Sequence, residues 1–265
     1  MGGKVAYNPH HPFFDHFLFT QKAAGDAVAK QTIPSPTMLF RDNRSDNWPE
    51  FYASWEDYLA DLGKAYNETI KHFYDLGCRY LQIDDTTWAF LISKLNESQD
   101  NPEEHAKYVH LAESAVVINA ALEGLPEDLT VTTHICRGNF KSTFLFSGGY
   151  EPVVPYLAQL NYDGFFQEYD SDRSGDLAPI NQIWNGRENV KLVLGLVTSK
   201  FGQLEDKDAV IARLKEASGY VPLANLCLSP QCGFASTEEG NTLTEEEEWN
   251  KLKFIKEVAD EVWGE

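Results

Sequence analysis

The segment TVTTHICR, residues 130–137, decides the fold class of this chain. Its run of β-branched residues predicts a buried strand, and that strand ends at His134 and Cys136. Two other short apolar stretches close in the same way, one at Glu168 in FFQEYD and one before Cys232 in SPQCGF. In a barrel of parallel strands the carboxyl ends of the strands converge on one face, so these four residues are expected to meet there.

Strand-like and helical segments alternate along the chain, which is typical of βαβ units and a parallel sheet. The six predicted strands are Pro36–Phe40, Arg79–Ile83, Leu129–Ile135, Gly164–Tyr169, Val190–Val197 and Leu226–Pro230. The predicted helices are Pro12–Lys30, Ser54–Leu76, Glu103–Leu122, Tyr150–Leu160, Lys207–Tyr220 and one after Thr244, where Thr-Glu-Glu-Glu has the pattern of a capping box. The fold class is therefore α/β, of the (β/α)8 TIM-barrel type.

Six strands are two fewer than a closed barrel contains. We therefore expect residues 1–265 to form a single barrel domain that lacks the first two strands. An incomplete barrel leaves sheet edges that must be covered or paired. This predicts either a homo-oligomer or a complementing segment as a partner of the chain.

The composition excludes several classes of partner. The chain has 265 residues, of which 43% are hydrophobic, and this is enough for one large core. Its formal net charge of −19 argues against nucleic acid, because phosphate binding needs clustered Lys and Arg. We expect no membrane span and no signal peptide, since both need apolar runs that this sequence lacks. Four cysteines without a secretory signal favour the reducing cytoplasm.

The four strand-end residues have the composition of a zinc site. One imidazole (His134), two thiolates (Cys136 and Cys232) and one carboxylate (Glu168) suit tetrahedral zinc. The wide spacing and the absence of a CxxC pair differ from a zinc finger, and a site built from three strands is more often catalytic than structural. The other two cysteines, Cys78 and Cys227, lie in apolar contexts and are expected to be buried, inert thiols.

At THICRGNF, EYD, LGLVTSK and LSPQCGFAST the chain resembles the C-terminal catalytic barrel of cobalamin-independent methionine synthases, and above all their short single-barrel bacterial relatives. The resemblance extends from PSPTMLF to the last helix. It implies that the catalytic domain binds Zn²⁺ through the same four residues. The tryptophan that long members of the family carry after the strand matching PTMLF is replaced by Phe40 and Arg41.

The same resemblance implies a substrate site after the strand LQIDD. Asp84 matches the acidic residue that holds the amino group of homocysteine, and Asp85 stands where many members have Glu. Trp88 follows three residues later and is a candidate to line the pocket. Asp84 and Glu168 are thus the predicted catalytic residues, and Asp84, Asp85 and Trp88 the predicted substrate-binding residues.

Charge counting predicts the type of reaction. Zinc with one neutral imidazole, two thiolates and one carboxylate carries a net charge of −1, which suits activation of a substrate thiol better than generation of hydroxide. The resemblance to cobalamin-independent methionine synthases further implies methyl transfer to homocysteine, giving methionine, from the polyglutamate form of 5-methyltetrahydrofolate. Two alternatives stay open: zinc-dependent alkyl transfer with another thiol or another donor, such as a corrinoid or a methylated amine, and an inactive barrel fragment.

Overall fold

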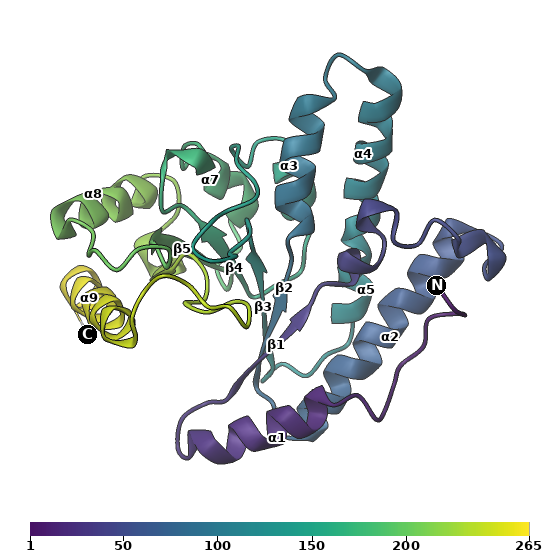
Figure 1. Ribbon diagram of the computed structural model, residues 1–265, viewed down its shortest axis with the longest axis horizontal. Coiled ribbons are helices and arrows are strands. Elements are labelled where there is room, and N and C mark those ends of the chain that lie inside the picture. The colour runs from purple at the N-terminus through teal and green to yellow at the C-terminus, as the bar shows by residue number, and fades with distance from the viewer. Residues whose placement is uncertain (265) are drawn as a thin grey trace.

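A six-stranded parallel sheet forms the centre of the molecule. The computed structural model of the chain describes residues 1–264, apart from the side chain of residue 42. The strands follow one another across the sheet in chain order (Figure 1). They are β1 (Lys30–Pro34), β2 (Tyr80–Asp84), β3 (Thr130–Ile135), β4 (Gly164–Glu168), β5 (Lys191–Val197) and β6 (Leu226–Pro230). This arrangement confirms the predicted α/β class and the predicted number of six strands.

Helices connect successive strands and flank the sheet (Figure 1). Within the described residues the α-helices are α1 (Phe13–Ala24), α2 (Trp55–Asp75), α3 (Thr87–Glu97), α4 (Pro102–Ser114), α5 (Ile118–Leu122), α6 (Val154–Leu157), α7 (Pro179–Trp184), α8 (Lys207–Ser218) and α9 (Glu245–Trp263). Helix α7 contacts β5, and helices α8 and α9 contact β6. In the described part of the chain, no helix combines the length and the apolar character needed to cross a membrane.

The two faces of the sheet differ in their side chains. In β2, Leu81 and Ile83 are fully buried in the main apolar core, whereas Tyr80, Gln82 and Asp84 on the opposite face are only half-buried. Alternate residues of a strand point to opposite faces, so the first pair lies on the face that packs in the apolar core and the other three lie on the opposite face of the sheet. Between residues 1 and 264, no strand pairs with the outer edge of β1 or of β6.

The prediction of a strand at Pro36–Phe40 is wrong. The strand lies just before it, in β1, and Pro36–Leu39 is a 3₁₀-helix. Proline has no N–H to donate to a strand ladder, but it is well suited to the first turn of a helix. The hydroxyl of Ser35 accepts a hydrogen bond from the backbone N–H of Thr37 at 3.4 Å and caps this turn.

The predicted helices differ from the observed ones mainly where proline or glycine intervenes. The helix expected at Pro12–Lys30 ends six residues early, before Gly25, which has a φ of 58°. The helix expected at Tyr150–Leu160 is reduced to the single turn α6, in a segment with two prolines. Helices α3 and α7 were not predicted. The capping box of α9 is confirmed, because Thr244 and Glu247 satisfy each other's backbone N–H groups.

Candidate metal centre

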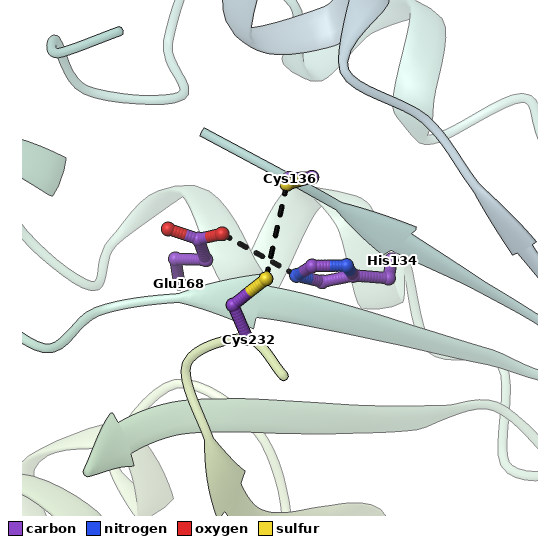
Figure 2. A group of neighbouring side chains, drawn as sticks. All are labelled: His134, Cys136, Glu168 and Cys232. Carbon is purple, nitrogen blue, oxygen red and sulfur yellow. Dashed lines mark hydrogen bonds and ion pairs between the residues drawn. The ribbon is translucent and has the colours of Figure 1, made fainter. Parts of the chain in front are cut away.

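The structure brings the four predicted ligands together at the carboxyl ends of three strands. His134 is the second-to-last residue of β3, and Cys136 directly follows the end of that strand. Glu168 is the final residue of β4, and Cys232 comes two residues after β6. Their ligand atoms all lie within 4.8 Å of one another, and the side chains converge on one point (Figure 2).

The distances within this group suit a tetrahedral zinc ion. Two sulfurs bound to zinc at about 2.3 Å lie about 3.8 Å apart in a tetrahedron, and the Sγ atoms of Cys136 and Cys232 are 3.9 Å apart. An imidazole nitrogen and a carboxylate oxygen, each about 2.0 Å from zinc, lie about 3.3 Å apart. The Nε2 atom of His134 and the Oε1 atom of Glu168 are 3.4 Å apart. The donor set and its spacing therefore fit Zn²⁺.

A glycine on β5 allows Cys232 to reach this group. Gly195 lies between Glu168 of β4 and Ser229 of β6 in the sheet register. A Cβ atom at Gly195 would lie 2.7 Å from the Cα atom of Gln231 and 3.1 Å from the backbone oxygen of Gln167. Because backbone atoms cannot retreat from such a contact cheaply, only glycine lets the segment after β6 fold back over the sheet.

Asp84 orients the imidazole of His134. The two residues are partners in the register of β2 and β3, and the Oδ1 atom of Asp84 lies 2.6 Å from the Nδ1 atom of His134. A carboxylate in this position holds the proton on Nδ1 and leaves Nε2 to face a metal. Burial alone would lower the pKa of His134, but the hydrogen bonds to Asp84 and Glu168 outweigh it and raise that pKa well above its usual value.

The two thiols of the group differ in protonation. The hydrogen bond that the Cys136 thiol donates to Cys232 lowers the pKa of Cys232 to about 6, against the opposing effect of burial. The same hydrogen bond, together with burial, raises the pKa of Cys136 well above its usual value. Without a metal, the raised pKa values of His134 and Cys136 favour their protonated forms, and the lowered pKa of Cys232 favours its thiolate.

Two of the predicted substrate residues lie elsewhere. Asp85 is buried, with its Oδ1 atom accepting hydrogen bonds from the hydroxyl of Thr37 at 2.9 Å and from the backbone N–H of Thr87 at 2.8 Å. Trp88 is also buried, and its ring stacks on that of Tyr156. The side chains of Asp85 and Trp88 do not join the four ligands, although the backbone N–H of Asp85 donates to the backbone oxygen of His134 at 2.8 Å.

Three residues around Glu168 were missed by the sequence analysis. The backbone N–H of Arg137 donates to Oε1 of Glu168 at 3.0 Å, and Arg173 donates to Oε2 at 2.8 Å. In the amide orientation that satisfies its neighbours, Gln231 also donates to Oε2, at 3.2 Å. The only signal in the sequence was indirect: Arg173 and Gln231 stand close to the predicted ligands Glu168 and Cys232.

Zinc binding is expected to release roughly two protons near neutral pH, because the imidazolium of His134 and the thiol of Cys136 must both lose theirs. Both pKa values are raised, so protons compete with the metal more strongly as the pH falls. The apparent zinc affinity should therefore tighten as the pH rises, by roughly tenfold per pH unit for each proton released. Calorimetry in buffers of different ionisation enthalpy counts these protons, and an affinity independent of pH would contradict the protonation states given above.

Comparison with known proteins identifies relatives of this chain. The sequence model of the family described as the catalytic domain of cobalamin-independent synthase matches residues 50–261. The uncharacterized protein YxjG of Bacillus subtilis (strain 168) is 48% identical over 259 residues, which are 96% of this chain and 66% of YxjG. The chain thus spans about two thirds of the length of that relative.

Solved structures agree with this relationship. A Listeria monocytogenes protein provisionally described as a vitamin-B12 independent methionine synthase superposes with a TM-score of 0.75 and 40% identity, over 99% of this chain and 73% of that one. A B12-independent methionine synthase from Shewanella sp. W3-18-1, in complex with selenomethionine, has a TM-score of 0.66 and 20% identity, over 95% and 67% of the two chains. The second likeness concerns the fold alone. With the family model covering most of its length, the chain belongs to the cobalamin-independent methionine synthase family and corresponds to its catalytic domain.

Proposed function

We propose that this chain is a zinc-dependent methyltransferase that methylates homocysteine to methionine, with the polyglutamate form of 5-methyltetrahydrofolate as the donor. In this proposal it acts as a 5-methyltetrahydropteroyltriglutamate–homocysteine S-methyltransferase. One observation carries the proposal: one imidazole, two thiols and one carboxylate converge, with the spacing of a zinc tetrahedron, at the catalytic edge of a barrel of this family.

The proposed roles of the ligands follow from their chemistry. His134, Cys136 and Cys232 would hold the ion, and Glu168 would be the fourth and weakest donor. When bound, zinc in this electron-rich set supplies a site at which a substrate thiol loses its proton and stays nucleophilic. Because two thiolates and a carboxylate give the set a net charge of −1, zinc in it is a poorer Lewis acid toward water than in an all-histidine set, so the proposed reaction is S-alkylation and not hydrolysis.

In this proposal Asp84 would bind the amino group of the thiol substrate. Its side chain is 38% exposed, although Oδ1 contacts His134, so the carboxylate can also accept from an α-ammonium group. A cavity of about 200 Å³ lies beside the centre, where His134 and Cys232 line it together with Lys30, Gln82 and Phe166, and Asp84 lies outside this lining. An ammonium held at Asp84 would orient an amino-acid thiol within reach of the four ligands.

The proposed methyl transfer is a simple displacement at the methyl carbon. The thiol proton leaves to solvent, the sulfur forms a bond to the methyl carbon, and the bond from that carbon to N5 of the donor breaks. The electron pair of the broken bond stays on the donor nitrogen, which takes up a proton. Oriented reactants and a thiolate nucleophile are the two contributions that this chain's residues would make.

Incubating the zinc-loaded chain with homocysteine and one methyl donor at a time tests the proposal. We expect methionine from the folate donor, and no methionine from the same mixture with the Cys136→Ser variant. Methionine formed only from a methylated corrinoid or a methylated amine would keep the methyltransferase and change its donor. An absence of methionine with every donor would contradict the proposed function.

A further inference from the structure

Glu168 is held by a buried arginine that is not one of the four candidate ligands. The Nη2 atom of Arg173 lies 2.8 Å from Oε2 of Glu168 and 2.7 Å from Oδ1 of Asp170. All three side chains are nearly or fully removed from solvent, with 8%, 0% and 4% exposure. The guanidinium carbon also lies 4.7 Å from the ring centre of Phe144, which covers it from the loop after β3. Charge-assisted hydrogen bonds in so dry an environment are strong.

The two oxygens of Glu168 have different surroundings. Oε1 lies 3.4 Å from Nε2 of His134 and therefore faces the group of four ligands. Oε2 is the atom that Arg173 holds, with the amide of Gln231 as a second donor at 3.2 Å. Oε1, which also accepts the backbone N–H of Arg137 at 3.0 Å, is thus the oxygen that faces a metal, while Oε2 is held by the guanidinium of Arg173 and the amide of Gln231.

Arg173 acts on its ligand in the opposite sense to Asp84. The carboxylate of Asp84 accepts the Nδ1 proton of His134, which makes the imidazole a better donor to a metal. The guanidinium of Arg173 instead draws electron density from Glu168 and competes with a metal for the same carboxylate. The structure therefore combines one strengthened ligand and one weakened ligand in a single centre.

We propose that Arg173 is a positioning residue that keeps Glu168 bound to the metal through one oxygen and receives the carboxylate when a substrate thiolate takes its place. This inference rests on the proposed function. In this exchange Oε1 of Glu168 would give up its place on the ion to the substrate sulfur, and the thiol proton would go to solvent. Glu168 keeps its hydrogen bond to Arg173 throughout, so no buried carboxylate is left without a cation.

The net charge of the centre explains why replacement of Glu168 by a substrate thiolate needs Arg173. A centre of zinc, one imidazole and three thiolates has a net charge of −1, the same as the resting set of one imidazole, two thiolates and one carboxylate. If Glu168 stayed on the metal as well, the charge would become −2 in a buried site. Arg173 avoids this extra negative charge on the centre, because the carboxylate of Glu168 stays paired with the guanidinium after it leaves the metal.

Three variants test the proposal by binding measurements that do not depend on turnover. Arg173→Gln removes the charge, and Arg173→Lys keeps the charge but replaces the planar guanidinium, whose Nη2 atom contacts both Glu168 and Asp170, with an ammonium on a different stem. Arg213→Gln is the matched control, because Arg213 pairs with Glu216 at the same distance of 2.8 Å on the exposed surface of α8. Competition with a chelator gives the zinc affinity. Titration of the cobalt-substituted protein with homocysteine, followed by the thiolate-to-cobalt charge-transfer absorption, gives the thiol affinity.

We expect Arg173→Gln to bind zinc no more weakly than the parent chain and to bind homocysteine about 10- to 100-fold more weakly. The homocysteine affinity of Arg173→Lys should lie between those of the parent chain and Arg173→Gln. If Arg173→Gln does not fold, Arg173→Lys takes its place in the test. Arg213→Gln should match the parent in both measurements. Unchanged thiol affinity in the Arg173 variants, or a loss of zinc in step with the loss of thiol, would overturn the assignment. A parent chain whose cobalt form gains no thiolate absorption would instead contradict the proposed function itself.

Discussion

Replacing Cys136 or Cys232 with serine is expected to abolish retention of zinc by the purified chain. The two sulfurs lie 3.9 Å apart at the centre of the ligand group, and a hydroxyl is a far weaker donor to a borderline-soft ion than a thiolate. If four ligands share an apparent binding free energy of about 10–16 kcal/mol, losing one costs roughly 3 kcal/mol, on the order of a hundredfold in affinity. Metal analysis after dialysis against a chelator measures this effect.

Cys227→Ser is the control for the loss of a thiol. Cys227 is a half-buried cysteine on β6 that forms no disulfide, lies five residues before Cys232, and is not one of the four converging residues. Its serine variant should retain zinc as the parent does. If both Cys136→Ser and Cys232→Ser kept a full complement of zinc, the metal would have to be bound elsewhere and the proposed centre would be wrong.

Asp84→Asn is expected to impair the centre in two ways. It removes the carboxylate that fixes the imidazole of His134 at 2.6 Å, which should weaken zinc binding by about 10- to 100-fold. It also removes the charge proposed to bind the substrate ammonium, so the KM for homocysteine should rise even when zinc is saturating. Zinc titration and steady-state kinetics at saturating zinc separate the two effects.

The neighbouring substitution Asp85→Asn distinguishes a specific effect on zinc binding from a general loss of stability. Asp85 is buried among the hydroxyls of Thr37 and Thr87, and burial raises its pKa despite the hydrogen bonds it accepts. Its loss should lower the melting temperature and leave zinc affinity unchanged. Equal losses of zinc affinity in the Asp84 and Asp85 variants would show that both act only through general stability.

The convergence of the four candidate ligands could be predicted from the sequence, because each lies at or just after the end of a predicted strand. His134, Cys136, Glu168 and Cys232 each terminate a β-branched or apolar stretch, and parallel strands carry such residues to one edge. The failure at Pro36–Phe40 has a local cause, because its apolar residues resemble a strand while the proline at its start favours a helical turn.

The contacts that tune the site could not be read from the sequence. The pairing of Asp84 with His134 depends on the register of β2 against β3, which composition does not determine. The role of Arg173 depends on the path of the loop after β4, which turns a residue five positions after Glu168 back onto its carboxylate. The need for glycine at position 195 likewise depends on the close approach of the segment after β6, which the sequence does not show. Such long-range geometry follows from tertiary packing and not from local pattern.

The zinc content of the purified chain, followed by X-ray absorption at the zinc edge with and without homocysteine, tests the central claim most directly. We predict one zinc per chain, bound by two sulfurs and two lighter atoms in the resting protein. Addition of homocysteine should give three sulfurs and one lighter atom, as the substrate replaces Glu168. A chain without zinc, or a zinc environment that homocysteine does not change, would contradict the claim that these four residues form a thiol-activating centre.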